Sequence, residues 1–93
     1  MFTWDILKAI VNFDKHGVSF EEAATAFDDG DGLDWEDLEH SAVENRRKRL
    51  ARSNLGRVLL TVYTIRELQD GKETIRIISS RRASQRELEA YFG

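Results

Sequence analysis

Two histidines and one glutamate are the side chains of this sequence best suited to moving protons. His16 and His40 are the only residues whose unperturbed pKa lies near neutrality, so either could act as a general acid or base. Glu44, beside a basic run, is a further candidate base. For each histidine, the alternative is a surface residue that takes no part in catalysis.

Four arginines are suited to binding an anion, because a guanidinium group binds phosphate oxygens with two hydrogen bonds and stays charged. We expect them at or near the ends of the last two strands: Arg66, Arg76, Arg81 and Arg82. Like charges on one sheet repel, so the cluster implies either an anionic ligand or carboxylate partners. The candidate partners are the acidic first half of the chain and Glu67, Glu73 and Glu87.

A second basic group occupies one short run that contains Arg46, Arg47, Lys48, Arg49 and Arg52. On a strand, alternate side chains point to opposite faces, so both faces would carry cations. Such a density of charge is hard to bury, so at least one face meets solvent or an anion. The run is therefore either a ridge that contacts phosphates or a charged edge strand that resists unwanted pairing.

A third polar group should line one side of the first helix, since its members follow one another at helical spacing: Lys8, Asn12, Lys15 and His16. This stripe either faces a phosphate backbone or is the solvated face opposite the apolar one. The acidic loop Asp29-Gly30-Asp31-Gly32 does not have the register of a calcium loop, since Phe27 and Leu38 would stand at its first and last positions. We therefore expect no metal site.

Composition and the absence of known motifs exclude several classes of protein. The 93 residues favour one domain, 1–93, and the absence of Cys excludes disulfides, Cys-ligated metals and thiol nucleophiles. No Gly-rich phosphate loop, HExxH or GxSxG motif supports nucleotide hydrolysis, zinc hydrolysis or serine esterase chemistry, and no cofactor is expected. The net charge of −3 combines an acidic first half with a basic second half. Either the basic half binds an anionic partner or the two halves neutralise each other.

The elements that must position these residues form an α+β pattern of two helices, an antiparallel sheet and a C-terminal helix. The first helix is capped by Asp5 and ends at Gly17, and the second starts at Ser19. Strands are predicted at about 46–53, 57–66 and 73–80, with the second central, and a short strand at 33–35. Ser84 and Glu87 predict a capping box for the last helix.

The apolar residues of the first helix recur at three- and four-residue spacing and predict the face that packs on the sheet: Ile6, Leu7, Ile10, Val11 and Phe13. No segment is long and apolar enough to span a membrane, and the N-terminus shows no signal-peptide pattern. These features predict a soluble cytoplasmic protein.

Taken in order, the motifs resemble the BrnT family of small ribonuclease toxins. The resemblance rests on the opening Trp4-Asp5, Lys8, Asn12 and Lys15-His16-Gly17-Val18-Ser19-Phe20, on His40-Ser41 with Glu44 and Arg46, on Gly56-Arg57-Val58-Leu59-Leu60 and Tyr63-Thr64 with Arg66, and on Arg76-Ile77-Ile78-Ser79-Ser80-Arg81. It covers nearly the whole chain. The segment Arg46–Arg49 is more basic than the family pattern.

The resemblance implies a RelE-like fold, RNA cleavage and a BrnA-type ribbon-helix-helix antitoxin, with promoter DNA bound only through the toxin–antitoxin complex. RNA cleavage without a metal needs a base for the 2′-OH, cations for the phosphorane charge and a proton for the leaving oxygen. We hypothesise that Arg66, Arg76 and Arg81 supply the cations and that His40 or Glu44 is the base. The strand of RNA would contact Lys8, Lys15, His16, Arg46, Arg47, Arg49 and Arg82. The alternative is a non-catalytic or degenerate toxin that binds its antitoxin or RNA without cutting.

Overall fold

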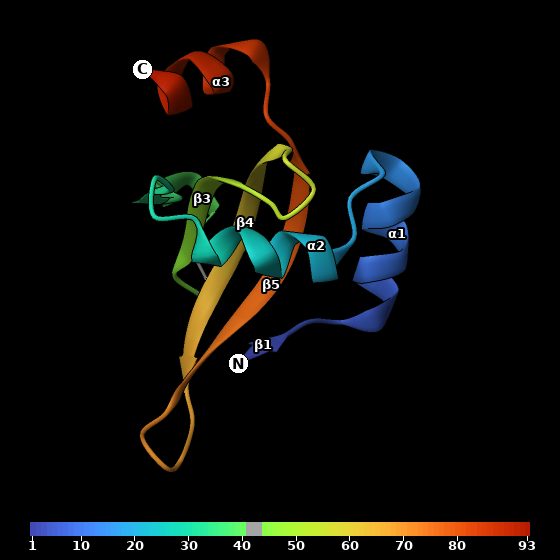
Figure 1. Cartoon of the computed structure of the whole chain (residues 1–93). Coiled ribbons are helices and arrows are strands. Elements are labelled where there is room, and N and C mark those ends of the chain that lie inside the picture. The colour runs from blue at the N-terminus through green and yellow to red at the C-terminus, as the bar shows by residue number, and fades with distance from the viewer. Residues whose placement is uncertain (41–43) are drawn as a thin grey trace.

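The fold is built on one five-stranded sheet, seen in a computed structural model that describes residues 1–40 and 44–93 (Figure 1). The strand order is β1-β5-β4-β3-β2. The elements are β1 (Phe2–Thr3), α1 (Ile6–His16), α2 (Phe20–Thr25), the 3-10 turn η1 (Ala26–Asp28), β2 (Leu33–Glu36), the 3-10 turn η2 (Leu38–His40), β3 (Arg46–Arg52), β4 (Val58–Glu67), β5 (Glu73–Arg82) and α3 (Gln85–Phe92). The predicted α+β class is confirmed, with three α-helices in the described part of the chain and a five-stranded sheet whose strand β1 precedes the first helix.

The sheet follows the sequence pattern closely. The short strand at 33–36 and the three long strands all form, and β4 is the central strand, as its Val, Leu and Thr content predicts. Four strands pair antiparallel, but β1 pairs parallel with β5 through Phe2 and Thr3, so the sheet is not wholly antiparallel. The register shifts between Val62 and Tyr63, which leaves Ile78 as an extra residue in β5.

The two faces of the sheet are covered by different helices. Val18, Phe20 and Ala23 pack with Leu59 and Ile77 on the face that carries α1 and α2. On the other face, Leu88 and Tyr91 of α3, with Ala83 just before the helix, pack against a smaller cluster of Leu50, Val58 and Leu60. Because α3 reaches only one end of its face, the rest of that face is left for polar side chains.

The orientation of α1 is the reverse of the predicted one. All five apolar residues expected to pack inward are exposed, and the buried residue of the helix is Asn12. Its carboxamide Nδ2 donates to the carbonyl oxygens of Val18 and Ser80 at 2.9 and 2.8 Å, and its Oδ1 accepts from the Ser80 amide at 3.0 Å. The strand β1 pairs with β5 only at Ile75 and Arg76. Asn12 therefore supplies the edge hydrogen bonds of β5 beyond the end of β1.

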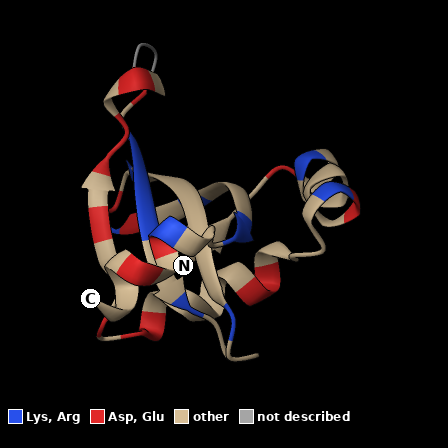
Figure 2. Ribbon diagram, turned by 90° about the horizontal axis from the view of Figure 1, so that it is seen from above, with Lys and Arg blue, Asp and Glu red and all other residues tan. Residues whose placement is uncertain are grey.

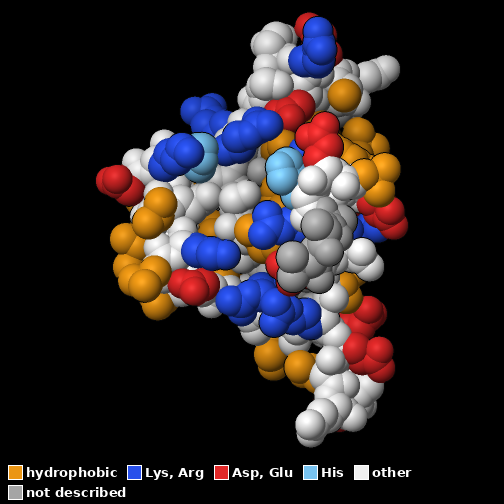
Figure 3. Space-filling view, turned by 180° about the vertical axis from the view of Figure 1, so that it is seen from behind, with side chains coloured by type: hydrophobic (Ala, Val, Ile, Leu, Met, Phe, Trp, Pro, Cys, Tyr) orange, Lys and Arg blue, Asp and Glu red, His pale blue; other side chains and the backbone are white. Residues whose placement is uncertain are grey.

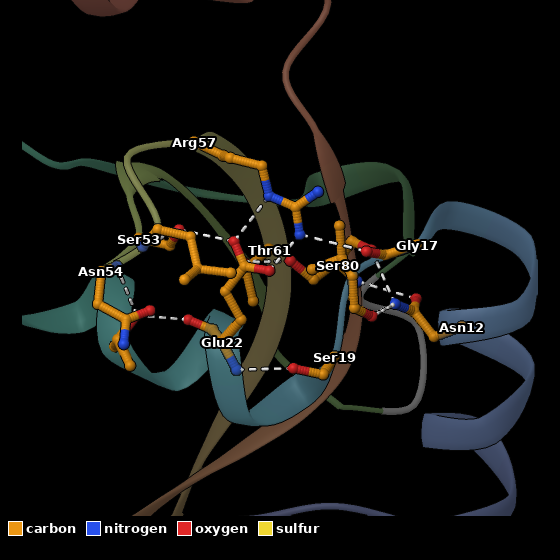
Figure 4. Close-up of polar contacts among 12 residues, drawn as sticks. Asn12, Gly17, Ser19, Glu22, Ser53, Asn54, Arg57, Thr61 and Ser80 are labelled. Atoms are coloured by element: carbon orange, nitrogen blue, oxygen red, sulfur yellow. Dashed lines mark hydrogen bonds and ion pairs between the residues drawn. The ribbon is translucent and has the colours of Figure 1, made fainter.

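The junction between α2 and the β3–β4 turn is an ion-pair network around Glu22 (Figure 4). Glu22 is buried, and its carboxylate binds Arg57 and accepts from the Ser53 hydroxyl at 2.6 Å. The Arg57 guanidinium holds the pKa of Glu22 below its ordinary value. Ser19 caps α2 as predicted, while the Glu22 carboxylate goes to Arg57 and Ser53.

Part of the charge asymmetry is neutralised within the sheet, where acidic β2 lies beside basic β3 (Figure 2). Arg49 forms an ion pair with Asp34, and Arg47 lies 4.0 Å from Glu36. No helix in the described residues is long and apolar enough to cross a membrane.

Candidate functional site

Cationic side chains surround a hollow on the sheet face away from α2 (Figure 3). The hollow has a volume of about 250 Å³, and we call it the basic hollow. Its lining residues come from η2 and the loop before it and from β3, β4 and β5: Asp37, His40, Arg46, Lys48, Leu60, Val62, Ser79 and Arg81. Three cations thus converge on a floor of apolar and small side chains.

Strand periodicity explains why these residues share a face. Lys48 lies opposite Val62, which in turn lies opposite Ser79. Side chains two residues apart on a strand point the same way, so Arg46 and Arg81 join the same face. The alternate residues of β3 point to the other face.

His40 is held at the rim of the basic hollow by a buried carboxylate. Its Nδ1 lies 3.1 and 3.2 Å from the two carboxylate oxygens of Asp37. The amide of Asp37 donates to the carbonyl oxygen of Arg46 at 2.8 Å, which fixes this turn to the start of β3. Asp37 is 6% exposed whereas the His40 side chain is 59% exposed. A carboxylate on Nδ1 orients the imidazole and leaves Nε2 available for proton transfer.

Arg81 enters the hollow from β5 while α3 supplies its carboxylate partner. The two guanidinium nitrogens donate to the two oxygens of Glu87 at 2.8 and 3.0 Å. Glu87 also accepts from the Ser84 amide, which completes the predicted capping box. These contacts, that with Arg81 above all, lower the pKa of Glu87 to about 2.

This low pKa predicts a loss of stability in acid. Ionised Glu87 stabilises the folded state fully above its ordinary pKa of 4.5, and this contribution is lost as the pH falls toward about 2. Over that range the melting temperature should fall more steeply for the wild type than for Glu87→Gln, which cannot titrate. Circular dichroism melts at successive pH values measure the difference. Glu89→Gln, on the same helix, is the matched control, and equal slopes for wild type and Glu87→Gln would contradict the assignment.

Glu44 lies in an ion-pair group at the far end of the same face. Its carboxylate is 3.1 Å from Arg66 and 3.9 Å from Arg46. Arg76 and Arg46 both lie opposite Thr64, one on each side of β4. The structure therefore brings Arg46, Arg66 and Arg76 together beside the basic hollow, with Glu44 between two of them.

The predicted RNA-contacting residues of α1 line a second cavity next to the first. This groove, about 350 Å³ in volume, lies between α1 and β5 and includes Lys8, Lys15 and His16. Ser79 lines both the groove and the basic hollow, so the two are adjacent. Asn12 also lines the groove, but it is bound to Ser80 and is not part of a solvated stripe.

Three predicted RNA-contacting arginines lie away from the basic hollow. The Arg47 side chain contacts the Tyr63 hydroxyl at 3.4 Å. Arg49 binds Asp34 and the carbonyl oxygen of Ala26, at 3.1 Å from the latter. Arg82 lies opposite Leu59, on the face of α1 and α2. Their placement assigns Arg47 and Arg49 to contacts within the fold.

Two charged residues of the hollow, Lys48 and Asp37, were not among the predicted site residues. Lys48 alternates with Arg46 on β3, so strand periodicity was the signal that could have selected it. Asp37 stands three residues before His40, and this spacing suits a turn in which the carboxylate reaches the imidazole. Ser41, part of the His40-Ser41 motif, lies outside the described residues.

Comparison with known proteins shows the family of this chain and a solved structure with a similar fold. Residues 4–87 match the model of the family described as the ribonuclease toxin BrnT of type II toxin–antitoxin systems. No curated protein matches the chain. Among solved structures, the chain is similar to the Brucella abortus ribonuclease toxin BrnT with a TM-score of 0.65 and 22% sequence identity, over 91% of this chain and 99% of that one.

Proposed function

Since this chain belongs to the BrnT family of ribonuclease toxins of type II toxin–antitoxin systems, we propose that it cleaves RNA in the basic hollow without a metal ion. The observation that carries the proposal is the Asp37–His40 pair at the rim of a hollow lined by Arg46, Lys48 and Arg81. An oriented imidazole beside clustered cations is the arrangement that attack on a phosphodiester by the neighbouring 2′-OH requires.

In the proposed reaction, Nε2 of His40 takes the proton of the 2′-OH as that oxygen attacks the adjacent phosphorus. The charge that develops on the phosphorane is stabilised by Arg46, Lys48 and Arg81. The bond to the 5′-oxygen breaks as that oxygen takes a proton from solvent water, and His40 then returns its own proton to solvent. The products are a 2′,3′-cyclic phosphate and a 5′-hydroxyl.

The neighbouring cations would bind the flanking RNA. Arg66 and Arg76 extend the basic face on one side, and Lys8, Lys15 and His16 extend it on the other through the groove that shares Ser79. Phosphate contacts of this kind position a strand without reading its sequence. Glu44 is held between Arg66 and Arg46, so we assign it to positioning these arginines and His40 to the base.

Family membership supports the biological setting that we propose. The fold is RelE-like, the partner is a BrnA-type ribbon-helix-helix antitoxin, and the toxin inhibits translation in the cytoplasm by cutting RNA. Promoter DNA is bound only by the complex of toxin and antitoxin.

The proposal is tested by incubating the purified chain with unstructured RNA in EDTA and identifying the product ends. Cleavage that leaves 2′,3′-cyclic phosphate supports a metal- and ribosome-independent ribonuclease. Intact RNA under these conditions, with cleavage restored by ribosomes, would show that the hollow needs the ribosome to order the substrate.

Arg81→Ala is expected to lower the cleavage rate by about tenfold to 10²-fold. Removal of a well-aimed charge typically costs more, about 10²- to 10³-fold, but Glu87 already neutralises part of the Arg81 charge. Arg82→Ala, the next residue on the opposite face, is the matched control and should stay within twofold of the wild type. An Arg81→Ala rate within twofold of the wild type would show that Arg81 does not stabilise the charge on the phosphorane.

One observation favours a second candidate, a toxin that binds but does not cut. Arg81 is paired with Glu87, and both Arg66 and Arg46 are paired with Glu44, so three of the proposed cations already have carboxylate partners. If RNA binds to the wild type but stays intact both alone and with ribosomes, this second function replaces the first.

A further inference from the structure

The outward side of α1 is an apolar surface that nothing in the described part of the chain covers. Its five large apolar side chains are 52–70% exposed: Ile6, Leu7, Ile10, Val11 and Phe13. In Figure 3, hydrophobic side chains gather at the edge of the molecule where α1 lies. A contiguous exposed patch of this kind on a small protein marks a surface that binds another molecule.

The groove between α1 and β5 adds charge to this surface. Its apolar lining is formed by Leu7, Val11 and Ile78. Its charged or titratable lining residues are Lys8, Lys15 and His16, and none of its lining residues is acidic. A binding partner must therefore present apolar side chains flanked by carboxylates.

We propose that this groove binds an acidic amphipathic helix of the protein that neutralises the toxin, an inference that rests on the proposed function. The 11 residues of α1 make a helix about 16 Å long, which matches about three turns of a partner helix. Leucine-like side chains would pack along Leu7, Val11 and Ile78, and carboxylates would face Lys8 and Lys15.

The same observations disfavour two other occupants. RNA phosphates can contact Lys8 and Lys15, but the apolar lining is aliphatic and offers no Phe, Tyr or Trp on which bases would stack, so RNA would leave the apolar side chains uncovered. A second copy of this chain docked groove to groove would bring Lys8 and Lys15 toward the same cations of its partner.

Occupation of the groove would also block the basic hollow. Ser79 lines both cavities, so a helix seated against α1 and β5 lies beside the phosphate-binding cations. Docking would then exclude the RNA strand from Lys8, Lys15 and the floor of the hollow at once. Neutralisation by this route needs no change in the fold of the toxin.

The test is titration of the full chain with a designed 14-residue peptide that has leucines on one helical face and glutamates on both flanks of that face. A control peptide carries lysine in place of glutamate. The acidic peptide should bind, and NMR shifts should be centred on Leu7, Val11 and Ile78. Leu7→Asp with Val11→Asp should weaken binding by about 30-fold or more, because two apolar contacts are lost. Leu55→Asp, at an exposed position in the turn before β4, should bind as the wild type does.

A charge exchange tests the complementarity directly. Lys8→Glu with Lys15→Glu should reverse the preference, so that the lysine peptide binds more tightly than the glutamate peptide. Binding without preference between the peptides, or unchanged binding to the Leu7→Asp Val11→Asp variant, would overturn the proposal. So would an RNA oligonucleotide that binds less tightly to Leu7→Gln Val11→Gln than to the wild type, or a wild-type dimer that the Leu7→Asp Val11→Asp variant dissolves.

Failure of the docking surface can be told apart from failure of the proposed function. Leu7 and Val11 have no part in the proposed chemistry, so the uncharged Leu7→Gln Val11→Gln variant, which adds no carboxylate beside the lysines of the groove, should cleave RNA at the wild-type rate and resist inhibition by the acidic peptide. Cleavage without peptide binding would remove the docking surface alone. If the peptide binds but neither the wild type nor the variants cleave RNA, the ribonuclease proposal is contradicted and the docking proposal is retained.

Discussion

Replacement of His40 by Ala is expected to reduce the rate of RNA cleavage by about 10²- to 10⁴-fold, the loss typical of a positioned general base. The side chain is the one imidazole in the lining of the basic hollow, and Asp37 fixes its Nδ1 side. RNA binding should change little, because the phosphate contacts that we propose are made by Arg46, Lys48 and Arg81. Single-turnover cleavage and a filter-binding assay separate the two effects.

Two variants make this prediction specific. His16→Ala removes the other histidine, which lines the neighbouring groove, and should cost less than tenfold. Asp37→Asn keeps the shape of the turn but removes the carboxylate charge that orients His40, so the rate of cleavage should fall. If His40→Ala cleaves within threefold of the wild type, the base lies elsewhere and the Asp37–His40 pair is structural.

Asn12→Ala is expected to lower the free energy of unfolding by about 3 kcal/mol, more than an ordinary helix substitution. The carboxamide makes three buried hydrogen bonds, and its loss leaves the amide and carbonyl of Ser80 and the carbonyl of Val18 without their partner. Urea unfolding followed by tryptophan fluorescence measures the change. Since α1 is attached to β5 through this residue, hydrogen exchange should also become faster in α1.

The matched control is Lys8→Ala, one turn earlier on the same helix and exposed. It should alter stability by less than about 0.5 kcal/mol, as surface substitutions usually do. An Asn12→Ala protein as stable as the wild type would mean that water replaces the carboxamide, and the edge of β5 would then not depend on α1.

The strands were predictable because their sequence pattern and their environment agree. Val58–Glu67 is rich in β-branched and apolar residues and becomes the central strand. Helix ends were predictable for the same reason, since Asp5, Ser19 and Ser84 each accept a hydrogen bond from the first turn that they cap. Strands and helix ends depend on residues close together in the sequence, so they can be predicted from a single sequence.

The orientation of α1 was not predictable from local chemistry. Periodicity correctly identified an amphipathic helix, but the rule that the apolar side faces the core assumes a protein without partners. Here Asn12 and the small Ala9 face β5, and the apolar side is exposed. Because β1 ends before it reaches Ser80, the Ser80 backbone lacks a strand partner on that side. Asn12 supplies the missing hydrogen bonds, and it can do so only when the polar side of α1 faces β5.

The candidate site was predictable in part. Charge density selected the basic strands, but the sequence pattern alone did not reveal that β2 would neutralise Arg47 and Arg49 while Arg46 and Lys48 face the hollow. The pairing of Arg81 with Glu87 was among the alternatives, and the α3 capping box brings it about. Which cations remain available to a ligand is therefore decided by strand pairing over long sequence separations.

The way in which Asn12 completes β5 has a consequence for the solubility of the chain. An edge strand with free amides and carbonyls is a template on which another polypeptide adds as a further strand, the first step of aggregation. Here the edge of β5 at Ser80 meets a side chain instead of another backbone, because one carboxamide uses both the donor and the acceptor of Ser80. A folding intermediate in which α1 has not yet docked would present that edge openly. Aggregation during refolding should therefore be governed by how quickly a single helix reaches its place.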